Sequence, residues 1–392
     1  MTAAVLPDVG AARPPSRTQP LFVAAALIAI FVISWIAGTH GWRQTALVIL
    51  GSLIGLTLYH SSFSFAGAYR RFFVYRETRG IEAHLLLLVL GTLAFAPVLA
   101  LGIPGGDIPT GAVAPVGVSV AIGSFLFGIG MQLGGGCGSG TLYTAGGGST
   151  RMAFTLIAFC GGAFLGSLHL DFWQSLPHLR EMSLNRDLGS FAGPSVQIGF
   201  IAILWLALRQ MRSPSGDRRQ EKPSFVRGNW SLASAAVVLS ALNAVTLVIA
   251  GHPWAITWGF TLWGAKASTL LGWSPTTSLF WQSEYASRAL ASGVLADSVS
   301  TMNIGILAGA FLAAALAGRF ALSWRMPWRS LAAAVLGGLV MGYGARLSFG
   351  CNIGAFVSGV ASTSLHGWQW IAFALPGAWI GVRLRPLFGL RN

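Results

Sequence analysis

The chain has 392 residues, of which 54% are hydrophobic and only 9% are charged, and its mean hydropathy is +0.66. This composition excludes a soluble globule and predicts an all-α integral membrane protein embedded in a lipid bilayer. The net charge of +14 has two compatible interpretations. Arginines gather in cytoplasmic loops by the positive-inside rule, and surplus positive charge concentrates an anionic solute at the pore mouths.

A polar, Pro-rich tail, residues 1–20, precedes the first apolar stretch. No clear small-residue cleavage pattern follows that stretch, so we expect a retained span rather than a signal peptide. Most of the candidate spans are about 17–22 residues long. They begin near Leu21, Gln44, His84, Val113, Met152, Ser195, Ser231, Ile256, Met302, Ser330 and Trp368.

A basic linker, residues 210–229, divides the chain into a first membrane half, 21–209, and a second, 230–392. The two halves are related by an internal repeat at one fixed offset, without gaps. Such a duplication in an apolar chain indicates a transporter. The matched positions are Gly123, Gly128, Gly130, Leu133, Gly136, Cys137 and Gly140 with Gly337, Gly342, Gly344, Leu347, Gly350, Cys351 and Gly354.

The loops that precede the two cysteine motifs differ in charge. Residues 101–110 carry Asp107 and no basic residue, whereas 318–329 carry Arg319, Arg325 and Arg329. By the positive-inside rule these loops lie on opposite faces, which predicts inverted repeats. One extra crossing between residues 251 and 301 would make the repeats parallel instead.

The first cysteine loop, GGGCGSGTLYTAGGGS at 134–149, contains eight glycines in sixteen residues. Glycine costs a helix about 1 kcal/mol relative to alanine, so we expect a broken or re-entrant segment that is packed inside protein or lines a wet cavity. Backbone N–H groups at the start of a following half-helix suit an anion. The second loop, SFGCNIGAFVSGVAST, is similarly small and polar.

Close helix packing around an inert thiol explains either loop taken alone. Two copies with cysteine at the equivalent position favour a function. Cys160 has Ala374 as its counterpart and lies in a plain apolar run, so we interpret it as a packing residue. No disulfide framework or metal-ligand spacing is present in the sequence, and no cofactor or nucleic-acid partner is indicated.

The motifs GGGCGSGTLY and FGCNIGAFVSGV, together with SFAGAYR and TLWGAKAS, resemble those of the YeeE/YedE family of bacterial inner-membrane thiosulfate transporters. The resemblance spans roughly residues 48–385. It implies an hourglass-shaped, multi-pass protein in which buried loops from both faces meet near the midplane. Thiosulfate would pass between thiols that donate S–H hydrogen bonds rather than attack as nucleophiles. A soluble thiol-carrying or rhodanese-like partner is a further family expectation.

The family has a third cysteine where this chain has Ser64. A hydroxyl still donates to an oxyanion, so sulfite or sulfate is an alternative substrate. Lys266 and Arg346 are candidate anion contacts, or charges that snorkel or pair with Glu284 or Asp297. The predicted substrate-binding residues are Ser64, Gly136, Cys137, Ser139, Thr141, Lys266, Arg346, Gly350, Cys351 and Asn352.

Two other classes of function compete with anion transport. A sulfurtransferase-like membrane enzyme would need a base near its nucleophile, and neither cysteine motif contains His, Asp or Glu. A soft-metal permease would need more Met, His or Cys ligands and a less positive chain. The chain also lacks a Walker motif, so a transporter that is not an enzyme is the expected function.

Overall fold

The computed structural model describes residues 18–103, 108–211, 224–322 and 324–392. Most of the predicted tail, Asp107 and the centre of the linker lie outside these ranges. Within them, ten segments are long and apolar enough to cross a membrane. The long helices are α1 (Pro20–Gly38), α2 (Trp42–Ser61), α4 (Arg79–Leu101), α5 (Val118–Gly134), α7 (Thr150–Leu168), α10 (Ala192–Gln210), α11 (Leu232–Ala250), α15 (Ser298–Leu316), α16 (Trp328–Leu347) and α18 (Leu365–Leu384).

Shorter elements connect these helices. They are α3 (Phe65–Tyr75), α6 (Gly138–Gly146), α8 (Leu170–Ser175), α9 (Leu184–Leu188), α12 (Thr257–Leu270), α13 (Leu279–Gln282), α14 (Glu284–Ala291), the π-helical turn η3 (Asn352–Val357), α17 (Ser358–Ala361) and the 3-10 turns η1 (Pro275–Thr277), η2 (Val294–Ala296) and η4 (Arg385–Phe388). The strands β1 (Pro115–Gly117) and β2 (His178–Glu181) form one antiparallel pair. The predicted all-α membrane class is confirmed.

The span predicted to begin near Ile256 is not one of the ten. α12 has 14 residues, which is about 21 Å at 1.5 Å per residue and shorter than the ~30 Å hydrocarbon core. The chain leaves the helix at Leu271, and Gly272 follows with a φ of +88°. Hydropathy alone did not reveal this stop.

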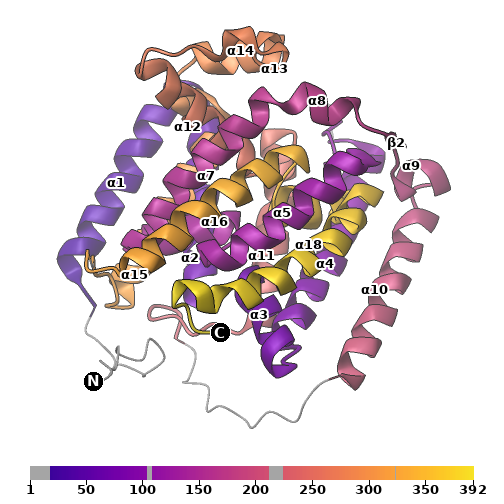
Figure 1. Ribbon diagram of the computed structural model, residues 1–392, viewed down its shortest axis with the longest axis horizontal. Helices are drawn as coiled ribbons and strands as arrows, with labels where there is room; N and C mark the ends of the chain where they lie inside the picture. The colour runs from indigo at the N-terminus through magenta and orange to yellow at the C-terminus, as the bar shows by residue number, and fades with distance from the viewer. Residues whose placement is uncertain (1–17, 104–107, 212–223, 323) are drawn as a thin grey trace.

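Four helices, α5, α7, α16 and α18, form the centre of the molecule, with α1 and α10 on opposite sides in Figure 1. α16 packs against both α5 and α7, and α18 packs against α5. Glycines allow the closest approach. A Cβ built on Gly123 would lie 2.7 Å from the Gly344 carbonyl oxygen, and one on Gly130 would lie 2.7 Å from that of Gly337. α5 and α16 therefore run antiparallel, and no larger residue fits at these crossings.

Two of the central helices, α5 and α16, each end a few residues before a cysteine. α5 ends at Gly134, and Gly135 takes a φ of +90° before α6 starts at Gly138. α16 ends at Leu347, and Gly350 has a φ of +154° before η3 starts at Asn352. Both cysteines are completely buried, in the main hydrophobic cluster. The fold thus places two broken helices in its interior.

Candidate functional site

A thiol or hydroxyl caps the helix N-terminus at each of the three positions that the motifs single out. Cys137 caps α6, and its Sγ accepts from the Gly140 amide at 3.4 Å. Cys351 caps η3, and its Sγ accepts from the Ile353 amide at 3.5 Å. Ser64 caps α3, and its Oγ accepts from the Gly67 amide at 3.0 Å. Each cap residue therefore stands at the positive end of a short helix, where an anion is stabilised.

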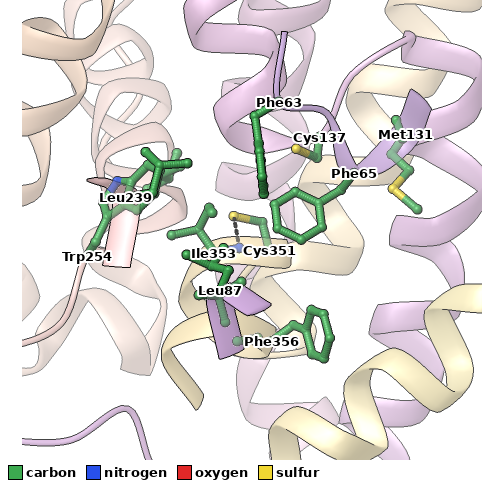
Figure 2. Close-up of a cluster of buried hydrophobic side chains, with 14 of the residues drawn as sticks. Phe63, Phe65, Leu87, Met131, Cys137, Leu239, Trp254, Cys351, Ile353 and Phe356 are labelled. Carbon is green, nitrogen blue, oxygen red and sulfur yellow. Dashed lines mark hydrogen bonds between the residues drawn. The ribbon is translucent and has the colours of Figure 1, made fainter. Parts of the chain in front are cut away.

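The two cysteine loops touch each other. A Cβ built on Gly138, the residue after Cys137, would lie 3.0 Å from the Sγ of Cys351. Figure 2 shows both thiols in one buried cluster, with Phe65 and Ile353 beside them. Residues that are far apart in sequence and equivalent in the repeat are thus brought together in the interior.

The start of α3 joins the same cluster. The Phe65 backbone lies beside the Cys137 thiol, and Tyr143 of α6 lies beside both Ser64 and Cys137. Ser64 is half-buried, whereas Cys137 is completely buried. The structure therefore places Ser64, which stands where the family has its third cysteine, close to Cys137.

Several buried polar atoms around the thiols lack a hydrogen-bond partner within the described residues. They are the Thr141 hydroxyl, the Tyr69 hydroxyl and both polar atoms of the Asn352 side chain. Tyr69 lies beside Cys137 and Asn352. An unsatisfied buried polar group costs about 1–3 kcal/mol, so a polar ligand that reaches these atoms would be stabilised by hydrogen bonds to them.

The remaining loop residues shape the site. The Ser139 hydroxyl lies 3.4 Å from the Cys137 Sγ, and either atom can donate in this contact. A Cβ on Gly136 would approach the backbone of Gly140 and Thr141 at 3.2 Å, and one on Gly350 would lie 2.6 Å from the Ala355 nitrogen. Small residues are thus required where the chain turns into each half-helix.

The π-helical start of the second half-helix is a further local feature. The amides of Ala355 and Phe356 both bond to the Cys351 carbonyl, at 2.9 and 3.3 Å. π-helical turns are rare and occur frequently at functional sites.

Two predicted site residues lie in other surroundings. The Lys266 ammonium donates to the carbonyls of Leu290 and Ser292 at 2.8 and 2.5 Å. Arg346 lines a separate cavity, together with Gly354 of η3. Anion contact by Lys266 stays a prediction, and its two carbonyl partners favour a structural role.

The site also contains residues that sequence reasoning did not single out. Tyr69 lies within the quoted SFAGAYR motif and Tyr143 within the GGGCGSGTLY motif, but neither was weighed as a donor. A buried tyrosine normally finds a hydrogen-bond partner. The presence of a tyrosine in each of these two motifs of small residues could therefore have indicated a hydroxyl donor at the site. All three cysteines are free thiols. The described residues hold no group of three or more His, Cys, Asp or Glu side chains arranged to bind a metal.

Comparison with known proteins identifies the family. A family model described as "Sulphur transport" matches residues 60–380. The chain belongs to the Sulphur transport family. This match and the relatives below confirm the YeeE/YedE family that the motifs predicted.

Three named transporters resemble the chain, two of them over most of its length. It is 28% identical to the thiosulfate transporter TsuA of Spirochaeta thermophila over 346 residues, which are 85% of this chain and 96% of that protein. It is 24% identical to the thiosulfate transporter TsuA of Escherichia coli over 355 residues, 86% of this chain and 94% of that one. A probable transporter YedE of Salmonella typhimurium is 35% identical over 41% of this chain and 39% of its own length. The chain is thus a multi-pass membrane protein of a sulfur-compound transport family.

Proposed function

We propose that the chain imports thiosulfate across the inner membrane of a bacterium, through the buried site formed by Ser64, Cys137 and Cys351. The observation that carries this proposal is the contact between the two cysteine loops, beside buried polar atoms that have no hydrogen-bond partner among residues 18–103, 108–211, 224–322 and 324–392. Two relatives that cover nearly the whole chain are named thiosulfate transporters, which supports the choice of anion.

The chemistry of the site suits an anion with one sulfur end and several oxygens. A thiol is a polarisable, weak donor that suits the terminal sulfur, whereas hydroxyls and backbone amides suit the oxygens. The helix N-termini at Cys137, Cys351 and Ser64 each contribute roughly 0.3–1 kcal/mol of attraction for a negative charge, and more in a partly buried geometry. Thr141 and Asn352 would satisfy their free polar atoms on the same anion.

Inverted repeats place one cysteine loop toward each side of the membrane. The contacts of Gly123 with Gly344 and of Gly130 with Gly337 support this arrangement. In the repeat Gly123 corresponds to Gly337 and Gly130 to Gly344, so exchanging the two halves turns one contact into the other. Because α5 and α16 are antiparallel, this relation is the one expected for inverted repeats. We propose an hourglass with repeat halves 21–209 and 230–392, in which the anion passes from one cysteine to the other.

The distribution of charge supports an orientation. α3 and the C-terminus lie at the end of the molecule opposite α13 and α14 (Figure 1). By the positive-inside rule the arginine-rich end faces the cytoplasm, so we place α13, α14 and α8 outside. The arginines on or next to α3 and the C-terminal segment are Arg70, Arg71, Arg76, Arg79, Arg383, Arg385 and Arg391.

Catalysis by a loop cysteine is the competing function. A nucleophilic cysteine needs a base in reach. Among the described residues neither Cys137 nor Cys351 is hydrogen-bonded to a carboxylate or an imidazole, and the nearby His84 ring stacks on Phe65, which favours transport without covalent chemistry. Ser64 keeps sulfite or sulfate as alternative substrates, and a rhodanese-like protein as receiver of the anion stays a proposal drawn from the family.

Growth of a bacterium that lacks its own sulfate and thiosulfate importers tests the proposal, with thiosulfate as the sole sulfur source. The wild-type chain and Cys160→Ala should restore growth, whereas Cys137→Ala and Cys351→Ala should not, at equal abundance in the membrane. Labelled thiosulfate recovered unchanged inside vesicles separates transport from catalysis. Growth of the strain that carries the variant with both loop cysteines replaced contradicts the proposal. Failure of the wild-type chain to restore growth contradicts it as well.

A further inference from the structure

A second cavity lies directly beside the Cys351 loop. Its volume is about 260 Å³, and it is lined by Trp254, Trp258, Tyr285, Arg346, Gly354 and Ser358, among others. We call it the Arg346 cavity. A water molecule occupies ~30 Å³ in the liquid, so this space can hold a tetrahedral oxyanion with part of its hydration. Gly354 lies in η3, which Cys351 caps, and Ser358 begins α17, which follows η3 directly, so the cavity is adjacent to the proposed path.

Arg346 brings to the cavity a positive charge that has no ion-pair partner among the described residues. Its guanidinium carbon lies 4.1 Å from the centre of the Phe280 ring and 5.9 Å from that of Trp258. Its Nε is buried without an acceptor, and no carboxylate in the described part of the chain forms an ion pair with it. A charge at such a position is expensive, and intramembrane charges of this kind are generally functional.

Trp254 supplies a second free donor. Its side chain is 1% exposed, and its indole N–H has no acceptor within the described residues. Its backbone is held in place, because its amide donates to Asn243 and its carbonyl accepts from Ser358. Trp254 and Arg346 thus line one cavity, and each carries an N–H donor without an acceptor among the described residues.

The imidazole of His252 also lines the cavity, and both of its nitrogens are already in hydrogen-bonding contacts. His252 contacts the Pro253 carbonyl through Nδ1 and the Ser298 hydroxyl through Nε2, at 2.9 and 2.8 Å. Both ring nitrogens of His252 are thus engaged, and the nearby Asp297 carboxylate already accepts from the Trp258 indole N–H, so the Arg346 guanidinium is the charged group that the cavity offers to a ligand. Such a site selects a negatively charged acceptor.

We propose that the Arg346 cavity is a separate binding site for the transported oxyanion, in which Arg346 and Trp254 hold its oxygens before it reaches Cys351. The identity of the anion rests on the proposed function. Hard N–H donors bind oxygens, which leaves the softer sulfur end of thiosulfate free for the Cys351 thiol. Tyr285 of α14 lines the cavity, so in the orientation proposed above the anion arrives from outside.

The test compares uptake kinetics and equilibrium binding of labelled thiosulfate, using the full-length protein in proteoliposomes and in detergent. Trp254→Phe removes only the N–H donor, and Arg346→Lys keeps the charge but loses the planar donor. Each should raise the apparent KM about tenfold, the effect of one charge-assisted hydrogen bond, with Vmax within about twofold of wild type. Arg383→Gln is the matched control, because Arg383 also stacks on an aromatic ring, Trp379, but does not line the cavity.

The outcomes separate this site from the proposed function. If Trp254→Phe and Arg346→Lys leave both the KM and the binding of thiosulfate unchanged, the Arg346 cavity is not an anion-binding site, and the proposal of thiosulfate transport is unaffected. Binding of thiosulfate or sulfate that depends on Arg346 and Trp254, in a protein that transports no thiosulfate, supports the cavity and overturns the proposed substrate. In Cys351→Ala, transport should fail while binding at the cavity persists. Loss of that binding would contradict the proposal that the cavity and the cysteine site are separate. If the wild type neither binds nor transports these anions, both proposals are wrong.

Discussion

Replacement of Gly138 by alanine perturbs the contact between the two cysteine loops with a single methyl group. The added Cβ would lie 3.0 Å from the Cys351 Sγ, 3.4 Å from its Cβ and 3.5 Å from the Ile256 side chain. Carbon prefers non-bonded neighbours at about 3.5–4.0 Å, so the loops must separate by roughly half an ångström or Cys351 must change its rotamer. Overpacking of this kind costs about 1–3 kcal/mol of unfolding free energy.

The same displacement moves the Cys351 thiol from its position at the anion. A weakening of about 1.4 kcal/mol corresponds to a tenfold loss of transport, which is the size we expect for Gly138→Ala in an assay of labelled thiosulfate uptake by vesicles. Gly140→Ala is the matched control on the same helix. Its Cβ would meet only the Cys137 Sγ, at an ordinary 3.5 Å, and uptake should be unchanged.

Two results would refute this reasoning. Wild-type uptake by Gly138→Ala would show that the contact between the loops does not lie on the transport path. Equal losses of uptake in both alanine variants would indicate a general intolerance of α6 to side chains rather than a specific clash with Cys351. Thermal unfolding of both purified variants distinguishes these effects from a loss of folded protein.

Four further variants test individual residues. Ser64→Cys should keep or raise thiosulfate uptake in vesicles, because it supplies the thiol that the family has at this position, and a clear loss would indicate a different anion. Thr141→Val removes a buried hydroxyl that has no hydrogen-bond partner in the part of the chain that the structure describes; thermal stability should be unchanged or up to ~1 kcal/mol higher, while uptake falls several-fold, and wild-type uptake would remove Thr141 from the site. Cys160→Ala should change uptake by less than twofold, and a larger effect argues against a packing role. Lys266→Gln should lower the unfolding free energy by about 1–3 kcal/mol, because it leaves the carbonyls of Leu290 and Ser292 without their charged donor; a change in KM without loss of stability would instead make it an anion contact.

Local features made much of the protein predictable from its sequence. Membrane insertion depends on the apolar content of each stretch, and breaks in helices depend on glycine, so the spans and the interruptions at Cys137 and Cys351 could be predicted one segment at a time. The short α12 was missed because its length is set by the turn at Leu271 and Gly272, and an average over apolar residues does not detect such a turn.

Composition and motif content are properties of the chain alone, so a membrane protein with two similar glycine-rich motifs, each with a cysteine, could be predicted before its fold was known. The contacts between residues distant in the sequence became visible only in the folded structure. Cys351 reaches Gly138, Lys266 reaches two carbonyls and Arg346 reaches the ring of Phe280 through the packing of helices distant in the sequence. The physical reason is that polarity and helix propensity act locally, whereas these contacts depend on how closely glycine-lined helices such as α5 and α16 approach each other.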